Sequence, residues 1–532
     1  MKPSSFFKMI LIAIAALALP QLLYAQDEPE YGIKFGGFVK VDAYSDSRQI
    51  TGARDDMFVF YPAPRQQTNA SPTVPIGFFD GVNPATATPL ISDPIAEKIY
   101  IFGNNDDLNA RGQTGFSVVQ SRISGKITAP DAFGAKITGL IEGDFFGPSD
   151  ATKYAFGLRH AWVNFDWGKT NLRAGQDWHP LFMQGGVFPD PVNFSPLAPI
   201  HPFGRAGQVA LTQKMGDLTL GLYLLEQSYH ADIDGSGTPN NLMQRRSKLP
   251  EAAVQLIYKL GGFTVGGTFD HREIVVGDDA NPTLAGGMPN TVVGNNRNRV
   301  QMNTYQAFAQ FKADDFAIKI ATTMGDNYVN INGIGGYGVK QTFLERNLAT
   351  IATQAGVDAT EAAQGAAAYS LLTKREYSPF QIRSYWAELV YGKNIEFGLL
   401  GGVTENLGAR DEIDSSKLYG RATGNLKQVT TIAPRVRFKS GRTVFGIEYN
   451  YSVARYLEDD KNQRALHADI ADNYLIDGSN YSIAGTNGTA YLNKNINGYL
   501  LANDDYRDSK GKINRTYSVA NHRIQLSVQQ FF

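Results

Sequence analysis

Short segments in which apolar and polar residues alternate recur through almost the whole chain, joined by connections that are alternately short and long. The sixteen segments are 32–45, 116–128, 135–147, 155–165, 171–178, 207–214, 218–228, 251–259, 263–273, 304–312, 316–325, 381–391, 395–406, 430–439, 443–454 and 516–532. This period of two is typical of a strand with different surroundings on its two faces. Short turns follow every second segment, and all but one of the intervening connections are long.

An even number of antiparallel strands with tight turns at one end and long loops at the other is the pattern of an outer-membrane barrel. We therefore predict an all-β fold, a 16-stranded antiparallel transmembrane β-barrel over residues 26–532, with short periplasmic turns and long extracellular loops. The longest loops are expected at about 46–115, 179–206, 326–380 and 455–515. A secreted, soluble multidomain β protein is the alternative, but it would not usually alternate its connection lengths so regularly.

The N-terminus predicts export. Residues 1–25 combine Lys2 and Lys8 with an apolar core and end in Leu-Tyr-Ala before Gln26. This is the layout of a secretory signal peptide, and its apolar run is too short for a transmembrane helix. We expect cleavage after Ala25 and localisation of the mature chain in the bacterial outer membrane.

The C-terminus predicts how such a chain is assembled. The last segment alternates apolar and polar residues and ends in Phe531 and Phe532. Outer-membrane barrels commonly end in an aromatic residue at the periplasmic interface, where it forms part of the signal read by the assembly machinery. We therefore expect outer-membrane lipid and, through Phe532, the barrel-assembly machinery to be partners of this chain.

Composition narrows the classes of function. The chain of 532 residues has a formal net charge of -1, which gives no reason to expect a nucleic-acid partner. It has no cysteine, so thiol catalysis and disulfides are excluded. Its seven histidines show no paired-ligand spacing. We expect no metal, no cofactor and no catalytic site.

The polar faces of the predicted strands are rich in charged residues. Such residues cannot face lipid near the midplane, where Arg or Lys costs about 2–4 kcal/mol. We therefore expect them to line a lumen, which is wide enough for water in a sixteen-stranded barrel. The candidate pore-lining residues are Lys40, Arg122, Glu142, Asp144, Arg159, Arg173, Arg435 and Arg437.

Basic residues outnumber acidic ones on these faces, and the stretch "PRVRFK" places three cations on one face. A ring of such charges favours anions. The alternative is that arginines and acids pair with one another and only stabilise the wall. We expect Arg122, Arg159 and Arg173, together with an inward fold of the loop 179–205, to form the narrowest region.

Several of these stretches resemble one family. "GGFVKVDAYSD", "VVQSRISGKI", "KITGLIEGDFFG", "GLRHAWVNF", "NLRAGQDW", "YWAEL" and "TIAPRVRF" are similar to the DcaP-like outer-membrane porins, most clearly over 116–209. The resemblance implies a trimeric sixteen-stranded channel for small anions such as dicarboxylates, with Arg122, Arg159 and Arg173 as lumenal cations. Some members carry an N-terminal periplasmic coiled coil, whereas only "QDEPEY" precedes the first strand here.

These observations predict a porin, a water-filled channel through which small hydrophilic, mainly anionic solutes diffuse passively. Two other classes stay open. The long loops on a closed barrel could serve an adhesin or receptor, and an outer-membrane enzyme is a further alternative. Liposome swelling separates the porin from both, and lipid hydrolysis by the pure protein tests the enzyme.

Overall fold

The structure is a computed structural model, and it describes residues 32–66, 107–147, 152–227, 231–234, 239–276, 299–331, 333–340, 376–421, 425–458 and 507–532. The predicted signal peptide lies outside these residues, as do most of the loops expected at 46–115, 326–380 and 455–515. No helix in the described part of the chain is long and apolar enough to cross a membrane.

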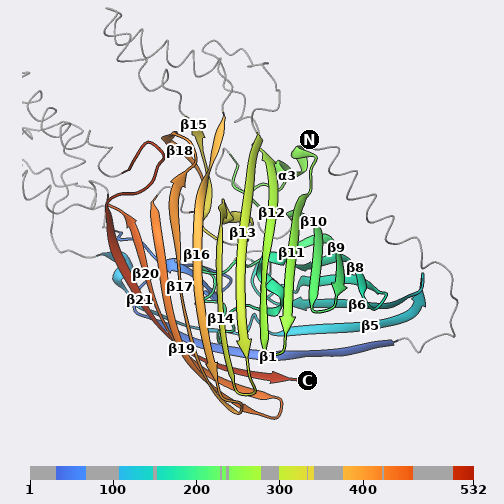
Figure 1. The fold of residues 1–532 in the computed structure, drawn as a ribbon. Helices are drawn as coiled ribbons and strands as arrows, with labels where there is room; N and C mark the ends of the chain where they lie inside the picture. The colour runs from blue at the N-terminus through green and yellow to red at the C-terminus, as the bar shows by residue number, and fades with distance from the viewer. Residues whose placement is uncertain are drawn as a thin grey trace, which may run out of the picture.

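The described residues form a closed antiparallel barrel of 16 strands, as predicted (Figure 1). In chain order the strands are β1 (Gly32–Asp46), β5 (Arg122–Ala132), β6 (Ala135–Asp144), β7 (Gly157–Asp166), β8 (Thr170–Trp178), β9 (Arg205–Met215), β10 (Leu218–Gln227), β11 (Glu251–Leu260), β12 (Phe263–Val275), β13 (Arg299–Lys312), β14 (Phe316–Asp326), β16 (Tyr377–Tyr391), β17 (Ile395–Ala409), β19 (Leu426–Ser440), β20 (Thr443–Leu457) and β21 (Thr516–Phe531). Each of the sixteen predicted segments corresponds to one of these strands.

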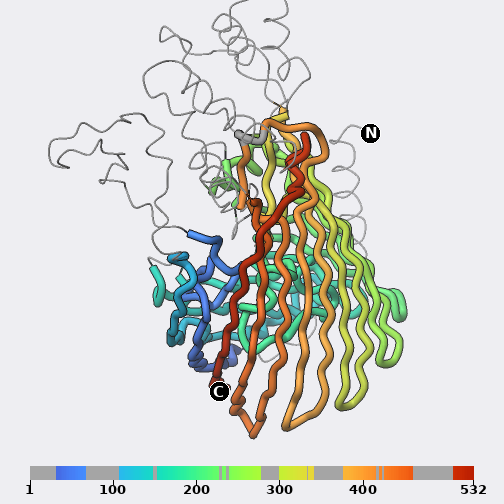
Figure 2. Tube along the Cα trace, turned by 90° about the vertical axis from the view of Figure 1, so that its left-hand side faces the viewer, coloured from blue at the N-terminus to red at the C-terminus, as the bar shows by residue number. Residues whose placement is uncertain are grey.

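The barrel is closed by its first and last strands. β1 pairs with β21 from Phe38 opposite Phe531 to Asp46 opposite Arg523. Figure 2 shows β21 and the neighbouring strands running side by side down to the C-terminus. At the start of this closure Gly37 has φ +155°, and a Cβ there would lie 2.1 Å from the carbonyl oxygen of Arg122. A residue without a side chain is therefore required where β1 passes between its two neighbours.

The second predicted strand is interrupted. β4 (Gln113–Ser117) pairs with the C-terminal part of β1, from Asp42 to Asp46, and β5 pairs with its N-terminal part, from Gly32 to Phe38. Between them the Ser121 hydroxyl accepts a hydrogen bond from the Lys40 backbone N–H at 3.0 Å, in place of a ladder bond. The sequence pattern of 116–128 is continuous in hydrophobicity, so it could not show this break.

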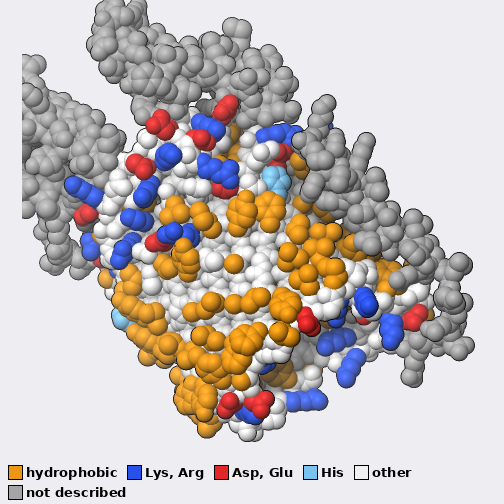
Figure 3. Space-filling view, in the orientation of Figure 1, with side chains coloured by type: hydrophobic (Ala, Val, Ile, Leu, Met, Phe, Trp, Pro, Cys, Tyr) orange, Lys and Arg blue, Asp and Glu red, His pale blue; other side chains and the backbone are white. Residues whose placement is uncertain are grey.

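The barrel wall is apolar outside and polar inside. On β21 Ile524, Leu526 and Val528 are 39–57% exposed, whereas Arg523, Gln525 and Ser527, which alternate with them, are at most 5% exposed. The space-filling view shows hydrophobic side chains gathered in a band over the outer wall, with most charged groups beyond it (Figure 3). A soluble protein has its apolar side chains inside and its polar ones outside. The reverse arrangement seen here is that of a membrane-spanning barrel of the outer-membrane type.

Smaller elements belong to the connections that were expected to be plain loops. β2 (Ile50–Ala53) and β3 (Phe58–Pro62) form a hairpin, and β15 (Gly335–Lys340) with β18 (Ile413–Arg421) extends the sheet beyond β16. The helices are short: α2 (Pro180–Met183), α3 (Leu242–Ser247) and the 3-10 turns η2 (Leu108–Ala110), η4 (Gln184–Gly186) and η5 (Tyr328–Ile331). The hairpin matters most here, because Phe58 and its neighbours are buried in the lumen.

Candidate functional site

The connection 179–205, which we call the inward loop, runs from β8 to β9 through the lumen. It begins with α2, where Pro180 occupies a position that suits a first helical turn and the His179 ring accepts a hydrogen bond from the Leu181 N–H at 3.2 Å. Gln184, Gly185 and Gly186 then all have positive φ, which reverses the chain into the barrel. The expected inward fold of this loop is what the structure shows.

Charged side chains from opposite parts of the wall hold the inward loop in place. Lys40 Nζ donates to the Val192 carbonyl at 2.5 Å, and Lys319 Nζ donates to the Phe188 carbonyl at 3.0 Å. Glu448 accepts a hydrogen bond from the Val192 N–H at 2.8 Å. Both carbonyl and N–H groups of the loop are therefore bonded to side chains of the wall, which fixes the loop to it.

Arg437 makes the densest of these connections. Its guanidinium donates to the Asp190 carboxylate at 2.7 Å and to the Pro191 carbonyl at 2.6 Å. The same group also lies 3.2 Å from Glu396 on the neighbouring strand. Arg437 therefore connects the inward loop to the wall rather than standing alone in the lumen.

An aromatic cluster packs against the inward loop. It consists of Phe58 from the hairpin, Trp178, and Phe182, Phe194 and Phe203 of the loop. Phe58 stacks on Phe194 with ring centroids 4.9 Å apart, and Trp178 lies 4.4 Å from Phe182. This apolar packing inside a polar lumen anchors the loop and occupies part of the barrel interior.

His201 belongs to the same loop and is buried against this cluster. Its Nε2 lies 3.0 Å from the Phe182 carbonyl, and its ring packs edge-on against Trp386. Burial lowers the pKa of His201 to about 3, with Lys319 adding to the effect and the hydrogen bond to Phe182 opposing it. The ring is therefore neutral at physiological pH and carries the proton on Nε2.

A recess of about 460 Å³ lies between the inward loop and the ends of the strands nearest the short turns. We call it the basic recess, because four of the five charged side chains that line it are cations. These are Lys40, Arg122, Arg437 and Lys439, with Asp190 as the one acid. Apolar contacts come from both the loop and the wall, among them Phe38, Phe188 and Phe531.

The four cations differ in how far they are neutralised. Lys40 lies 3.5 Å from Asp42 and is almost fully buried. Arg122 is 3.9 Å from Glu142, and its Nε has no hydrogen-bond partner among the described residues. Lys439 is paired with Glu396, but its side chain is 38% exposed. Arg122 and Lys439 are therefore the cations with most charge available to a solute.

The candidate residues on β5, β6 and β7 lie close together, but they have two different roles. Arg159 is 1% exposed, donates to Glu142 at 2.8 Å and is also paired with Asp144. It therefore lies within the wall, and the alternative of paired charges that stabilise the barrel describes it better. Arg122, one strand away, borders the basic recess.

Arg173 and Arg435 do not line the recess. Arg173 donates to Asp177 at 2.6 Å and lies over the Trp162 ring, 4.1 Å from its centroid. Arg435 is fully buried beside Glu388 at 2.9 Å. Of the three arginines expected at the narrowest region, Arg122 lines the basic recess, whereas Arg159 and Arg173 are paired with acids and do not line it.

Two residues of this site are not among the candidate pore-lining residues. Lys439 is the third cation of "PRVRFK" and follows Arg435 and Arg437 at spacing two, so its sequence signal is the same as theirs. Asp190 lies in a loop, where no periodicity shows which way a side chain points. Only the folded loop shows that it meets Arg437.

Comparison with known proteins supports the fold. The outer membrane channel DcaP of Acinetobacter baumannii is 12% identical, over 96% of this chain and 100% of that chain, with a TM-score of 0.53. An anion-selective porin from Comamonas acidovorans is 10% identical over 94% and 100%, with a TM-score of 0.44. No family model matches the chain, and no curated protein matches it in sequence. The expected DcaP-like resemblance is therefore confirmed at the level of the fold.

Proposed function

We propose that this protein is an outer-membrane porin through which small hydrophilic solutes, chiefly anions, diffuse passively. The observation that carries the proposal is the basic recess, in which four cations and one acid surround a space beneath the inward loop. In such a confined space each net positive charge lowers the barrier for an anion and raises it for a cation.

The class of anion is the finer part of the proposal. Arg122 and Lys439 keep accessible charge and come from separate strands, β5 and β19. Two cations on different parts of one wall suit a solute with two carboxylates, because each carboxylate can meet one of them. Dicarboxylates such as succinate are therefore the first solutes to test in liposome swelling against a neutral sugar of similar size.

The experiment for charge selectivity is the reversal potential of single channels in a KCl gradient. Replacing Arg122→Gln together with Lys439→Gln should lower the anion-to-cation permeability ratio several-fold. Screening over about 8 Å at physiological salt confines the effect to charges near the path. The matched control is Arg173→Gln with Arg245→Gln, which removes two exposed cations that do not line the recess. An unchanged reversal potential in the Arg122→Gln, Lys439→Gln variant would show that the basic recess does not set the charge selectivity.

We infer two further properties from the sequence resemblance and the barrel surface. A homotrimer would bury apolar side chains on the outer wall near β4, of which Phe116 is 79% exposed. Recognition of Phe532 by the barrel-assembly machinery would explain why an aromatic residue follows β21. A passive channel needs no covalent chemistry, so the pure protein should not hydrolyse phospholipid.

A further inference from the structure

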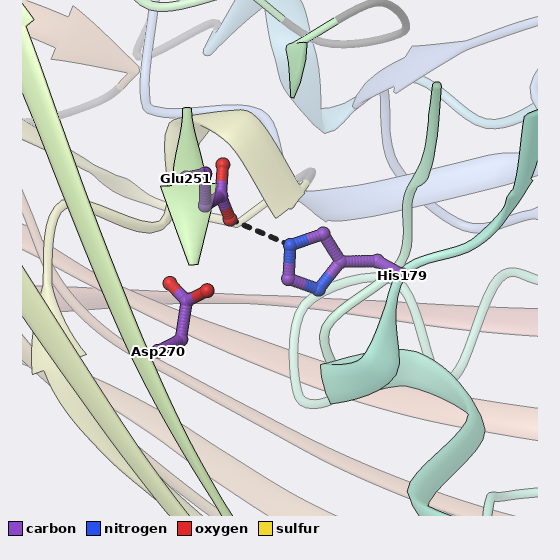
Figure 4. Close-up of side chains that lie close together, drawn as sticks. All are labelled: His179, Glu251 and Asp270. Carbon is purple, nitrogen blue, oxygen red and sulfur yellow. Dashed lines mark hydrogen bonds and ion pairs between the residues drawn. The ribbon is translucent and has the colours of Figure 1, made fainter. Parts of the chain in front are cut away.

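Three buried side chains meet where the inward loop begins. His179 precedes α2, Glu251 is the first residue of β11, and Asp270 lies on β12. Figure 4 shows their polar groups facing one another. One ligand atom from each, an imidazole nitrogen or a carboxylate oxygen, lies within 4.8 Å of the other two. All three residues are at most 3% exposed.

The group is not satisfied by the hydrogen bonds around it. His179 Nε2 lies 2.6 Å from Glu251, and Asn330 Nδ2 is 3.3 Å from both oxygens of that carboxylate. The Oδ1 of Asp270, by contrast, is buried with no hydrogen-bond partner among the described residues. The nearby cation Arg272 is already bonded to Asp232 and to the Asn327 carbonyl. Glu251 and Asp270 also lie within hydrogen-bond distance of each other, so unless they share a proton, two buried carboxylates stand side by side with no cation bonded to either. Such an arrangement is costly.

We propose that His179, Glu251 and Asp270 bind a divalent transition-metal ion of the Zn²⁺ type. One imidazole nitrogen with two carboxylate oxygens is a mixed nitrogen and oxygen set, which suits zinc better than calcium or magnesium. A solvent molecule would complete a four-coordinate site. The ion would neutralise both carboxylates and give the unpartnered oxygen of Asp270 a ligand bond.

Binding would also act on the inward loop. In the structure His179 Nδ1 accepts the Leu181 N–H, so the ring proton is on Nε2, where it faces Glu251. A metal ion at Nε2 displaces that proton, and a neutral ring then carries its proton on Nδ1. The Leu181 N–H loses its acceptor, a loss of one helix cap that is small beside the free energy of a structural zinc site. Metal occupancy is thereby coupled to the first turn of the loop.

Linear spacing could not reveal this site. His179 and Glu251 are 72 residues apart in the chain. They meet because His179 begins the inward loop, which enters the lumen, and Glu251 begins β11 of the surrounding wall. The absence of paired histidines, from which we expected no metal, concerns sites formed within one short segment. This site is formed by the closure of the barrel around its own loop.

The test uses the purified, detergent-solubilised protein, stripped with EDTA and titrated with ZnCl₂ by isothermal calorimetry. We expect saturation at one ion per chain. The zinc-loaded protein should also unfold at a higher temperature in a gel-shift assay than the stripped protein. Asp270→Asn and Glu251→Gln should each weaken binding at least tenfold. Asp314→Asn, which changes an exposed acid on a short turn, is the matched control and should bind as the wild type does.

A second measurement keeps the test decisive if those variants fold poorly. Co²⁺ added to the stripped wild type should give visible absorption bands that saturate at one equivalent and disappear when Zn²⁺ is added. The absence of saturable Zn²⁺ and Co²⁺ binding would overturn the proposal. So would an Asp270→Asn variant that is more stable than the stripped wild type while zinc stabilises neither, because the two carboxyl groups would then share a proton instead of an ion.

Discussion

At the scale of single residues, neighbours across the sheet decide what a lumenal charge does. Arg122 and Arg159 both come from predicted polar faces, and nothing in their periodicity distinguishes them. In the structure Arg159 is enclosed by Glu142 and Asp144, whereas Arg122 has one distant acid and borders the basic recess. The sequence could therefore predict which face is lumenal, but it could not predict which cation stays available.

This difference predicts opposite phenotypes. Arg159→Met leaves the buried Asp144 without its ion-pair partner and Glu142 with only the longer pair to Arg122. Removing one member of a buried ion pair costs about 3–5 kcal/mol. We expect the free energy of unfolding, measured by guanidinium titration in lipid vesicles, to fall by that order. Arg122→Met should change it less, because the Arg122 side chain makes one ion pair of 3.9 Å, and methionine can keep the packing on the Phe38 ring. Equal stability of the two variants would show that Arg159 does not fix the wall.

At the scale of elements, the strands and the inward fold of the loop 179–205 were predictable, but the hairpin that packs beside this loop in the lumen was not. The alternation of β21 identified its lipid-facing residues correctly, because a strand with lipid on one face must alternate. The hairpin of β2 and β3 inside the lumen left no such signal, since the stretch "MFVFYP" is apolar throughout. Loops whose side chains pack against other parts of the chain carry no period from which their position can be read.

The inward loop should respond to pH through His201. Since the pKa of this buried ring is about 3 and the ordinary value is about 6.5, folding disfavours its protonated form. Its contribution is complete above pH 6.5 and is lost as the pH falls toward 3, by about 2 kcal/mol at pH 5. The temperature at which the folded barrel unfolds in a gel-shift assay should therefore fall further between pH 7.5 and pH 5 for the wild type than for His201→Gln. The glutamine amide can still donate to the Phe182 carbonyl. Identical losses would contradict this assignment.

The last residue offers a test of assembly. Phe532 donates its backbone N–H to the Gly37 carbonyl at 3.2 Å, and its side chain is 56% exposed. Because so little of the fold depends on this ring, deleting Phe532 should leave refolding in detergent almost unchanged. In cells the same deletion should reduce folded protein in the outer membrane, while Phe532→Tyr should not. A deletion that also prevents refolding in vitro would indicate a structural role instead.

At the scale of the whole molecule, an inverted barrel surrounds a loop that is bonded to many of its strands. The outer wall carries the apolar band, and the inner wall carries the charged residues. The inward loop crosses the lumen and forms one side of the basic recess. A trimer would cover part of the outer wall near Phe116. We therefore expect a native mass of three chains in mild detergent, and Phe116→Arg should shift it toward the monomer.

This architecture should form an anion-preferring channel, and planar-bilayer recording of the wild-type protein tests that property most directly. In a KCl gradient we predict stepwise conductance and a reversal potential of the sign given by chloride permeation. The absence of conductance would contradict this, provided that the protein has inserted into the bilayer and migrates as a folded barrel in unheated gel samples. A reversal potential of the sign given by potassium permeation would contradict it equally.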